Sequence, residues 1–244
     1  MRLKQLDEAK SDFISIASHQ LRTPLTAIKG YASMILEESY GKLTNRMREP
    51  VNNIFQSSQR LVLIIGDFLD VSHIERGAME YNFEKTDMKE ILSGLFEEFN
   101  ASLSKSKMKN KAKALKLMFK ADPDADFLIN ADKNSLRQVF SNLIDNAIKY
   151  TEKGFVKIFL SKEEKSGKVM IKIEDTGVGV AKDTLPNLFR KFVRGGGHAS
   201  LHANGSGLGL YVAKEIIKAH KGKIWAESEG EGKGSRFFVE LVAV

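Results

Sequence analysis

The chain has 244 residues, 42% of them hydrophobic, so it can bury the core of one large domain or two small ones. It contains no run of about 18 apolar residues, which excludes a membrane-spanning helix, and its charged N-terminus lacks the apolar centre of a signal peptide. The net charge is +7, but the lysines are dense mainly in residues 102–120 and no recognition signature accompanies them, so we expect no nucleic-acid partner.

Residues 1–80 show the periodicity of helices rather than of strands. Apolar side chains recur at spacings of three or four along two segments, as amphipathic helices require. The first row comprises Ile14, Ala17, Leu21, Leu25, Ile28, Ala32 and Ile35, and the second comprises Met47, Val51, Ile54, Ser58, Leu61, Ile65, Phe68 and Ser72. The 4-3-4-3 spacing of the second row is typical of the seam of a bundle or coiled coil.

The ends of these two helices are marked by residues that stop or cap helices. Gly41 predicts the end of the first helix, Thr44 the cap of the second, and Gly77 the end of the second. Pro50 lies inside the second segment, so this helix either bends there or begins near Glu49. One helical hairpin buries little apolar surface, so we expect a homodimer with a four-helix bundle; packing on the rest of the chain is the alternative.

From about Thr86 onward, helix and strand patterns are mixed. Helices are predicted over residues 86–103, with Thr86 as cap, 132–151 and 209–220. Strands are predicted over residues 114–119, 126–130, 155–161, 168–175, 222–228 and 234–242. This order predicts an α+β two-layer sandwich with helices on one face of a mixed sheet.

His19 lies in the first predicted helix, roughly opposite the centre of the apolar row, so its side chain should face solvent. Arg22 and Thr23 follow at i+3 and i+4, on the same face. Pro24 removes a helical hydrogen bond and clashes with the carbonyl of Gln20, which weakens the helix beside the histidine. An exposed imidazole that titrates near neutrality can be a nucleophile or a proton carrier; by spacing alone, an idle surface histidine is the alternative.

The segment FISIASHQLRTPLTAIKGYASMIL, residues 13–36, resembles the H-box of the sensor histidine kinases of two-component signalling. That motif is usually written Ser-His-Glu/Asp-Leu-Arg-Thr-Pro-Leu. The resemblance implies that His19 is the phosphoacceptor, whose ring nitrogen attacks the γ-phosphate of ATP, with Gln20, Arg22 and Thr23 beside it in the catalytic group. Gln20 departs from the family pattern, because a glutamine can accept a hydrogen bond but cannot act as a base. We therefore expect slower autophosphorylation than an acidic residue at position 20 would give. The family's phosphatase activity uses an acid-x-x-Thr arrangement, of which this sequence keeps only Thr23, so phosphatase activity is less well supported than kinase activity.

Two asparagines mark a candidate nucleotide site in the second half of the chain. Asn142 and Asn146 are one helical turn apart and can offer amide oxygens to a hydrated Mg²⁺, while Lys149 can reach a phosphate. Plain amphipathic packing is the alternative role for this helix. Asparagines are poor helix formers, however, and two of them in one helix need a reason.

Further candidates follow along the chain. Asp175 ends a predicted strand, where a buried carboxylate can accept a hydrogen bond from an exocyclic amine such as adenine N6. Gly177 and Gly179 permit a close backbone approach there, although an ordinary turn is the alternative. The segment from Gly205 to Gly209 begins a helix whose N–H groups can hold phosphate, without the Walker lysine or a Rossmann context.

The order and spacing of these motifs resemble the ATP-binding domain of histidine kinases, in the superfamily that includes DNA gyrase and MutL. The resemblance implies that Asp175 reads adenine, that Asn146 binds Mg²⁺ with Asn142 assisting, and that Arg194 steadies the γ-phosphate. It also implies an ATP lid over residues 194–206. The nucleotide-binding residues expected on this basis are Asn142, Asn146, Lys149, Tyr150, Asp175, Gly177, Gly179, Phe192, Gly205, Ser206, Gly207, Leu208, Gly209 and Ser235.

The sequence therefore predicts an all-α hairpin that forms a dimeric four-helix bundle, residues 1–82, followed by an ATP-binding domain of the histidine kinase, gyrase and MutL type, residues 83–244. A hinge is placed at residues 82–87. The expected function is ATP-dependent autophosphorylation on His19, with Mg²⁺, and phosphotransfer to an aspartate of a response-regulator receiver domain. A conformational ATPase and a non-catalytic nucleotide-sensing dimer scaffold are the alternatives.

The expected location is the cytoplasm, either of a separate protein or of a fragment of a membrane-bound receptor. The second reading rests on Leu3, Leu6 and Phe13, which would let the first helix continue upstream as a coiled coil.

Overall fold

The computed structural model describes residues 2–109, 115–163, 166–193 and 206–244, without the side chains of residues 2–15, 19 and 105–109. The chain forms two compact units: the first comprises the residues up to Met79 together with Ser206, and the second comprises the other described residues from Glu80 onward. No helix in the described ranges is long and apolar enough to cross a membrane.

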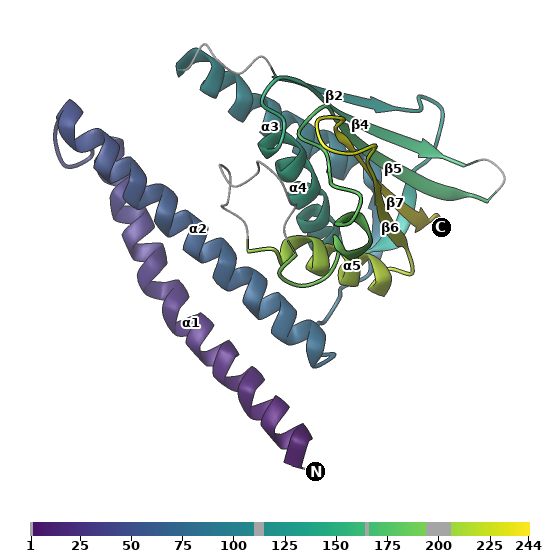
Figure 1. Ribbon diagram of the computed structural model, residues 1–244, viewed down its shortest axis with the longest axis horizontal. Helices are drawn as coiled ribbons and strands as arrows, with labels where there is room; N and C mark the ends of the chain where they lie inside the picture. The colour runs from purple at the N-terminus through teal and green to yellow at the C-terminus, as the bar shows by residue number, and fades with distance from the viewer. Residues whose placement is uncertain (1, 110–114, 164–165, 194–205) are drawn as a thin grey trace. The chain divides into compact units, whose positions relative to one another are not determined.

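The first unit is a hairpin of two long helices, α1 (Arg2–Leu36) and α2 (Asn45–Glu75), as the two apolar rows predict (Figure 1). Both helices continue through an internal proline, Pro24 in α1 and Pro50 in α2. The alternative start of the second helix near Glu49 is therefore wrong, because α2 begins at Asn45. One lost hydrogen bond does not end a helix that packs along most of its length against a partner.

The helix ends agree only partly with the sequence. Gly77 follows the end of α2, and its N–H donates to the carbonyl of Ile74 at 3.0 Å, as expected of a helix stop. Thr44 occupies the N-cap position of α2, but its side chain makes no capping hydrogen bond. The stop predicted at Gly41 is wrong, because α1 ends at Leu36 and a turn separates the two.

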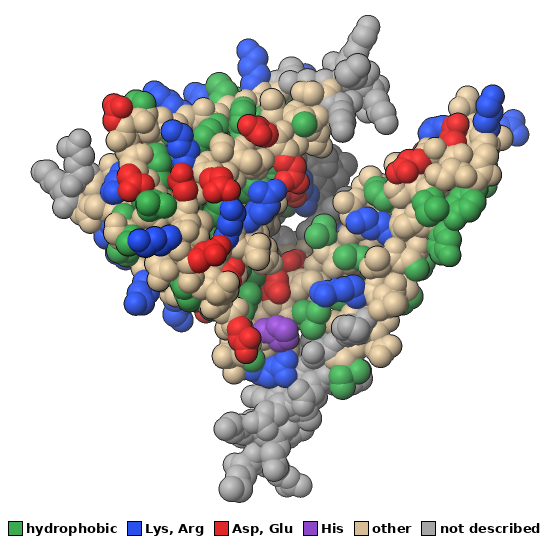
Figure 2. Space-filling view, turned by 180° about the vertical axis from the view of Figure 1, so that it is seen from behind, with side chains coloured by type: hydrophobic (Ala, Val, Ile, Leu, Met, Phe, Trp, Pro, Cys, Tyr) green, Lys and Arg blue, Asp and Glu red, His purple; other side chains and the backbone are tan. Residues whose placement is uncertain are grey.

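The seam predicted on α2 divides into two rows with different exposure. One row, at seven-residue spacing, is buried: Val51, Ser58, Ile65 and Ser72. The other, at the same spacing, stays exposed at 38–53%: Met47, Ile54, Leu61 and Phe68. On α1, Leu21 and Ile28 are likewise exposed, although they belong to the predicted core row. The hairpin thus keeps an apolar face in contact with solvent, and green hydrophobic side chains are visible along it in Figure 2.

The second unit is built on a five-stranded sheet in the order β2-β4-β5-β7-β6 (Figure 1). The strands are β2 (Leu115–Ala121), β4 (Gly154–Lys162), β5 (Lys168–Asp175), β6 (Lys223–Glu227) and β7 (Ser235–Val242). β2 pairs with β4 in parallel, and the remaining pairs are antiparallel. A parallel pair needs a crossover connection, and the segment containing α4 provides it.

Three helices cover one face of this sheet, which gives the predicted α+β two-layer sandwich (Figure 1). They are α3 (Met88–Lys109), α4 (Lys133–Lys149) and α5 (Gly209–Ala219). A short 3₁₀ turn, η1 (Leu185–Asn187), precedes α5. The core side of α4 presents Val139, Leu143 and Ile144, each at most 1% exposed, so the amphipathic packing predicted for this helix is present. The side of α4 that faces away from this core can therefore carry the polar side chains of a site.

A smaller antiparallel sheet pairs β1 (Glu84–Asp87) with β3 (Leu128–Ala131). The hinge expected at residues 82–87 is therefore misplaced, because most of that segment is a strand with a regular partner. The cap predicted at Thr86 is also wrong: its hydroxyl donates to the carbonyls of Glu84 and Ala131 within the small sheet. Asp87 takes the capping role, since its Oδ1 accepts the Lys89 N–H at 2.8 Å.

Candidate functional site: a nucleotide pocket and a phosphoacceptor helix

The two asparagines of α4 form a linked pair. The Asn146 amide donates a hydrogen bond from Nδ2 to Oδ1 of Asn142 at 3.2 Å, across one helical turn. The Nδ2 of Asn142 is buried and has no hydrogen-bond partner among the described residues. A buried donor without a partner is costly, which is the pattern expected where a ligand supplies the missing acceptor. The oxygen of Asn146 remains available for a cation.

The first residue of α5 lies directly against Asn142. A Cβ built on Gly209 would be 2.8 Å from Asn142 Nδ2 and 2.9 Å from its Oδ1, so only glycine lets the helix begin this close. The positive end of the α5 dipole therefore lies beside the unsatisfied amide. Leu208, immediately before the helix, is fully buried, and Gly207 accepts a hydrogen bond from Phe192 N–H at 2.9 Å. An amide donor and a helix N-terminus together suit a phosphate group.

Asp175 lies at the end of β5 and is only 6% exposed. Its Oδ2 accepts a hydrogen bond from the hydroxyl of Ser235, and its Oδ1 accepts the Gly177 N–H at 2.8 Å. Burial raises the pKa of this carboxyl above its ordinary value, and the hydrogen bonds from Ser235 and Gly177 oppose that rise. Each carboxylate oxygen keeps a second lone pair, so the group can also accept a hydrogen bond from an amine.

The glycines around Asp175 allow two loops to pack backbone against backbone. The Gly234 N–H donates to the Gly177 carbonyl at 3.1 Å. A Cβ on Gly234 would lie 2.0 Å from the Asp175 carbonyl oxygen, and one on Gly177 would lie 2.3 Å from that of Tyr150. Gly179 likewise approaches a backbone carbonyl, that of Gly230. These contacts fix where the Asp175 carboxylate lies.

The other predicted nucleotide residues surround these groups. Lys149 ends α4, and its Nζ lies 5.2 Å from the ring centroid of Tyr150, which is the C-cap residue. Phe192 is 62% exposed. Thr151 was not predicted: its side chain is fully buried, and its hydroxyl would be 2.8 Å from a Cβ on Gly177. One signal in the sequence could have indicated it, namely its position directly after the helix that carries the two asparagines. Arg194 and Gly205 lie outside the described residues, as does nearly all of the expected lid.

On α1, the exposed side chains of Gln20, Arg22 and Thr23 lie around the candidate phosphoacceptor. The backbone of His19 is helical, and its side chain is outside the described part of the structure. Pro24 leaves the Gln20 carbonyl without its usual helical donor. Farther along, the Thr26 hydroxyl donates to the Arg22 carbonyl at 2.8 Å, a type of bond that often accompanies a bend in a helix.

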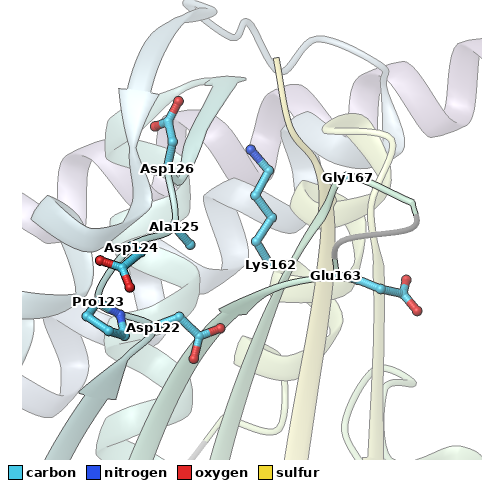
Figure 3. A pocket seen from close by; sticks show the side chains of 8 residues that line it. All are labelled: Asp122, Pro123, Asp124, Ala125, Asp126, Lys162, Glu163 and Gly167. Atoms are coloured by element: carbon cyan, nitrogen blue, oxygen red, sulfur yellow. The ribbon is translucent and has the colours of Figure 1, made fainter.

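A separate surface pocket lies between the β2–β3 loop and the β4–β5 hairpin (Figure 3). Its acidic side chains Asp122, Asp124 and Asp126 point in different directions in Figure 3. Within the described ranges, no group of three or more His, Cys, Asp or Glu side chains could hold a metal ion. This pocket contains none of the predicted nucleotide residues.

Two family models match the chain. Residues 9–77 match the His Kinase A (phospho-acceptor) domain, and residues 131–243 match the histidine kinase-, DNA gyrase B-, and HSP90-like ATPase. The chain belongs to the sensor histidine kinases. It carries their phosphoacceptor and ATPase domains in that order, with the fold that the resemblance predicts.

Individual relatives agree with this assignment. The chain is 33% identical over 228 residues to hybrid signal transduction histidine kinase L of Dictyostelium discoideum, covering 92% of this chain and 13% of that protein. It is 32% identical over 231 residues to the circadian input-output histidine kinase CikA of Synechococcus elongatus, covering 95% and 30%. The chain thus spans less than a third of the length of either. The crystal structure of full-length ShkA in complex with AMPPNP superposes with a TM-score of 0.72 at 27% identity, over 94% of this chain and 45% of that one.

Proposed function

We propose that this chain phosphorylates itself on His19 with ATP and passes the phosphoryl group to an aspartate of a response-regulator receiver domain. The single observation that carries the proposal is the unsatisfied Asn142 amide beside the N-terminus of α5, because both can donate hydrogen bonds to a phosphate group. The position of His19 in the matched phosphoacceptor domain supplies the acceptor. An exposed face of α1 beside His19 is the proposed docking surface for the receiver domain.

The nucleotide residues divide the recognition of ATP between them. Asp175 accepts a hydrogen bond from the adenine amine, and the Ser235 hydroxyl and Gly177 N–H hold its carboxylate in place. Lys149 and the start of α5 neutralise phosphate charge. Mg²⁺ is held by the amide oxygen of Asn146 and supplies the remaining charge neutralisation that phosphoryl transfer requires. Asn142 orients Asn146 through their hydrogen bond and gives its own N–H to a phosphate oxygen.

In the proposed transfer, the lone pair of one His19 ring nitrogen forms a P–N bond with the γ-phosphorus. The bond between that phosphorus and the β,γ-bridging oxygen breaks, and ADP leaves. The other ring nitrogen then loses its proton. Gln20 accepts the hydrogen bond from that N–H and holds the ring, but it cannot take the proton, which passes to water instead.

We propose that the chain acts as a homodimer. The exposed rows on α1 and α2, containing Leu21 and Ile28 and then Met47, Ile54, Leu61 and Phe68, support this, because a hairpin of this kind can bury such rows in a four-helix bundle with a second copy. The functional division that we propose places dimerisation and phosphate acceptance in residues 1–82, and ATP binding in residues 83–244.

Incubation with Mg²⁺ and γ-labelled ATP separates this function from the two alternatives. We expect acid-labile, base-stable label that is absent in His19→Gln. Release of inorganic phosphate without protein label would support a conformational ATPase instead. Binding of ATP with neither label nor phosphate release would support a nucleotide-sensing scaffold. The presence of Asn142 disfavours hydrolysis, since the gyrase and MutL class places a glutamate at this position.

A further inference from the structure

His220 is a buried histidine whose two ring nitrogens are both engaged. It is the C-cap residue of α5 and is 7% exposed. Its Nε2 accepts the backbone N–H of Asp132 at 3.0 Å, and its Nδ1 is 2.8 Å from the carbonyl oxygen of Ile216. An acceptor at Nε2 and a donor at Nδ1 define one form of the ring, the neutral Nδ1–H tautomer.

The ring joins the two helices that carry the nucleotide site. Asp132 is the N-cap of α4, and its Oδ1 accepts the Ser135 N–H at 2.8 Å. The bond from Asp132 to His220 therefore ties the beginning of α4 to the end of α5. Asn146 lies toward the other end of α4, and Gly209 begins α5. The contact thus holds the two helices together at the ends opposite those that face the nucleotide.

A third element packs on the same ring. The ring of Phe83 lies 4.9 Å from that of His220, and the ring of Tyr81 meets it edge-on at 5.5 Å. Between them, the Asn82 N–H donates to Oδ2 of Asp132 at 2.8 Å. Strand β1 begins immediately afterwards, with Glu84 paired to Ala131. Residues 81–83 are therefore attached to the ATP-binding unit before β1 starts.

We propose that His220, Asp132, Tyr81 and Phe83 form a latch, in which neutral His220 is the positioning residue that fixes residues 81–83, at the start of the second unit, to α4 and α5. Protonation opens the latch, because a second N–H at Nε2 would point at the Asp132 N–H instead of accepting from it. The consequence for autophosphorylation rests on the proposed function, whereas the latch itself does not.

The surroundings of the ring set the direction of its pH response. Burial lowers the pKa of His220 below its ordinary value, while the Ile216 carbonyl and the Asp132 carboxylate act in the opposite direction. Of the groups that contact the ring in the described structure, Asp132 and the Tyr81 phenol are titratable. Because the folded pKa lies below the unfolded value, the latch contributes its full stability above about pH 6.5 and loses it as the pH falls through the folded pKa.

The latch also sets the length of the connector, which is the segment between the end of α2 and the first anchored residue of the second unit. α2 ends at Glu75. With the latch closed, residues 76–80 separate α2 from the anchored segment; with it open, residues 76–83 do so. The effective concentration of one tethered unit at the other falls roughly as the −3/2 power of connector length. Opening should therefore lower the maximal rate of autophosphorylation about twofold without changing the KM for ATP.

The direct test is nuclear magnetic resonance of the full chain with ¹⁵N-labelled histidine, combined with amide hydrogen exchange, in the absence of ATP. We expect His220 to show the Nδ1–H tautomer and to remain neutral below the pH at which an ordinary histidine titrates. As it protonates, protection against exchange, corrected for the intrinsic pH dependence of amide exchange, should fall at least tenfold at the Asp132 amide and across residues 81–83. A ring that titrates at its ordinary pH, or the Nε2–H tautomer, would overturn the proposal.

Two variants complete the design. His220→Gln keeps a donor and an acceptor but does not titrate, so it should remove the pH dependence of exchange. Phe83→Ala keeps the ring hydrogen bonds but loosens the connector, so it should lower the maximal rate with an unchanged KM. Unchanged pH dependence in His220→Gln would contradict the latch even if the kinase is active. A pH-dependent latch in a chain that forms no phosphohistidine would contradict the proposed function alone.

Discussion

The Asn146 amide donates to Oδ1 of Asn142 at 3.2 Å, so the two part-buried side chains of α4 form one unit. This bond occupies an oxygen of Asn142 and leaves the oxygen of Asn146 for a cation. We therefore propose different roles for the two asparagines, Asn142 as a hydrogen-bond donor to phosphate and Asn146 as the Mg²⁺ ligand. That division leads to the first prediction.

Asn146→Ala should weaken binding of Mg²⁺–ATP about 10- to 100-fold, the loss of one strong polar contact, but should weaken Mg²⁺-free ATP much less. Calorimetric titration with and without Mg²⁺ measures both affinities. Asn134→Ala, an exposed asparagine at the start of the same helix, is the matched control and should change neither. Equal losses with and without Mg²⁺ would contradict the assignment of Asn146 to the metal.

Asp175→Asn should reduce ATP affinity about 10- to 100-fold, because it replaces a charged acceptor that two donors hold in place. Affinity for GTP, which lacks the amine at that position, should change little. Comparison of the two nucleotides by competition binding separates loss of adenine recognition from general damage to the site. A parallel loss for both nucleotides would argue against adenine recognition by this carboxylate.

The same variant tests the raised pKa of Asp175. Between its unfolded value of 3.8 and the higher folded value, the folded protein binds a proton that the unfolded chain does not. As the pH falls through this window, the free energy of unfolding of the wild type should therefore rise relative to that of Asp175→Asn. Urea unfolding at a series of pH values measures the difference, and a shift in the opposite direction would contradict the raised pKa.

Gly234→Ala should destabilise the second unit more than Gly232→Ala. Both glycines have φ near +70°, so each substitution carries a backbone cost of about 1–2 kcal/mol. A Cβ on Gly232 meets nothing within 4 Å, whereas one on Gly234 overlaps the Asp175 carbonyl, which adds about 1–3 kcal/mol. Thermal unfolding of the two variants gives the comparison. Equal destabilisation would mean that the loops do not pack as closely as described.

Gln20→Glu should raise the rate of autophosphorylation about 10- to 100-fold, because it supplies a base for the His19 proton and general bases contribute about 100-fold or more when well positioned. The rate is measured as phosphohistidine formed at saturating ATP. Gln56→Glu adds the same charge at an exposed position of α2 and should leave the rate unchanged. If Gln20→Glu gave no increase, proton acceptance at this position would not limit the reaction.

Leu61→Arg should convert the proposed homodimer to a monomer, because it places a charge in the middle of the exposed apolar row of α2. Light scattering at several concentrations measures the mass. Gln59→Arg introduces the same side chain at an exposed position outside the row and should remain dimeric. A dimer that persists in Leu61→Arg would place the interface elsewhere.

Much of the fold follows from periodicity alone. The rows on α1 and α2 and the alternation in β4, β5 and β7 indicate the elements, since burial imposes those periods on the sequence. The errors concern short polar signals. Thr86 resembles a helix cap, but pairing of β1 with β3 takes its hydroxyl, and the partner strand is more than 40 residues away. A local pattern cannot report a contact with so distant a segment.

In the candidate site, too, a local sequence pattern does not report contacts between distant segments. Asp175 and the asparagine pair were identified from their motifs, but the roles of the glycines depend on which backbone each one approaches. Likewise, His220 looks like an ordinary residue at the end of a helix. Its neighbours come from residues 81–83 and 132, which only the fold brings together.

Mass spectrometry at neutral to basic pH, after incubation of the full chain with Mg²⁺ and ATP, locates the transferred phosphate directly. We expect phosphate on the peptide that contains His19, at that residue, and a lower initial rate of labelling in Asp175→Asn at an ATP concentration that saturates only the wild type. Phosphate at another residue, or an unmodified His19 in a chain that binds ATP, would contradict it.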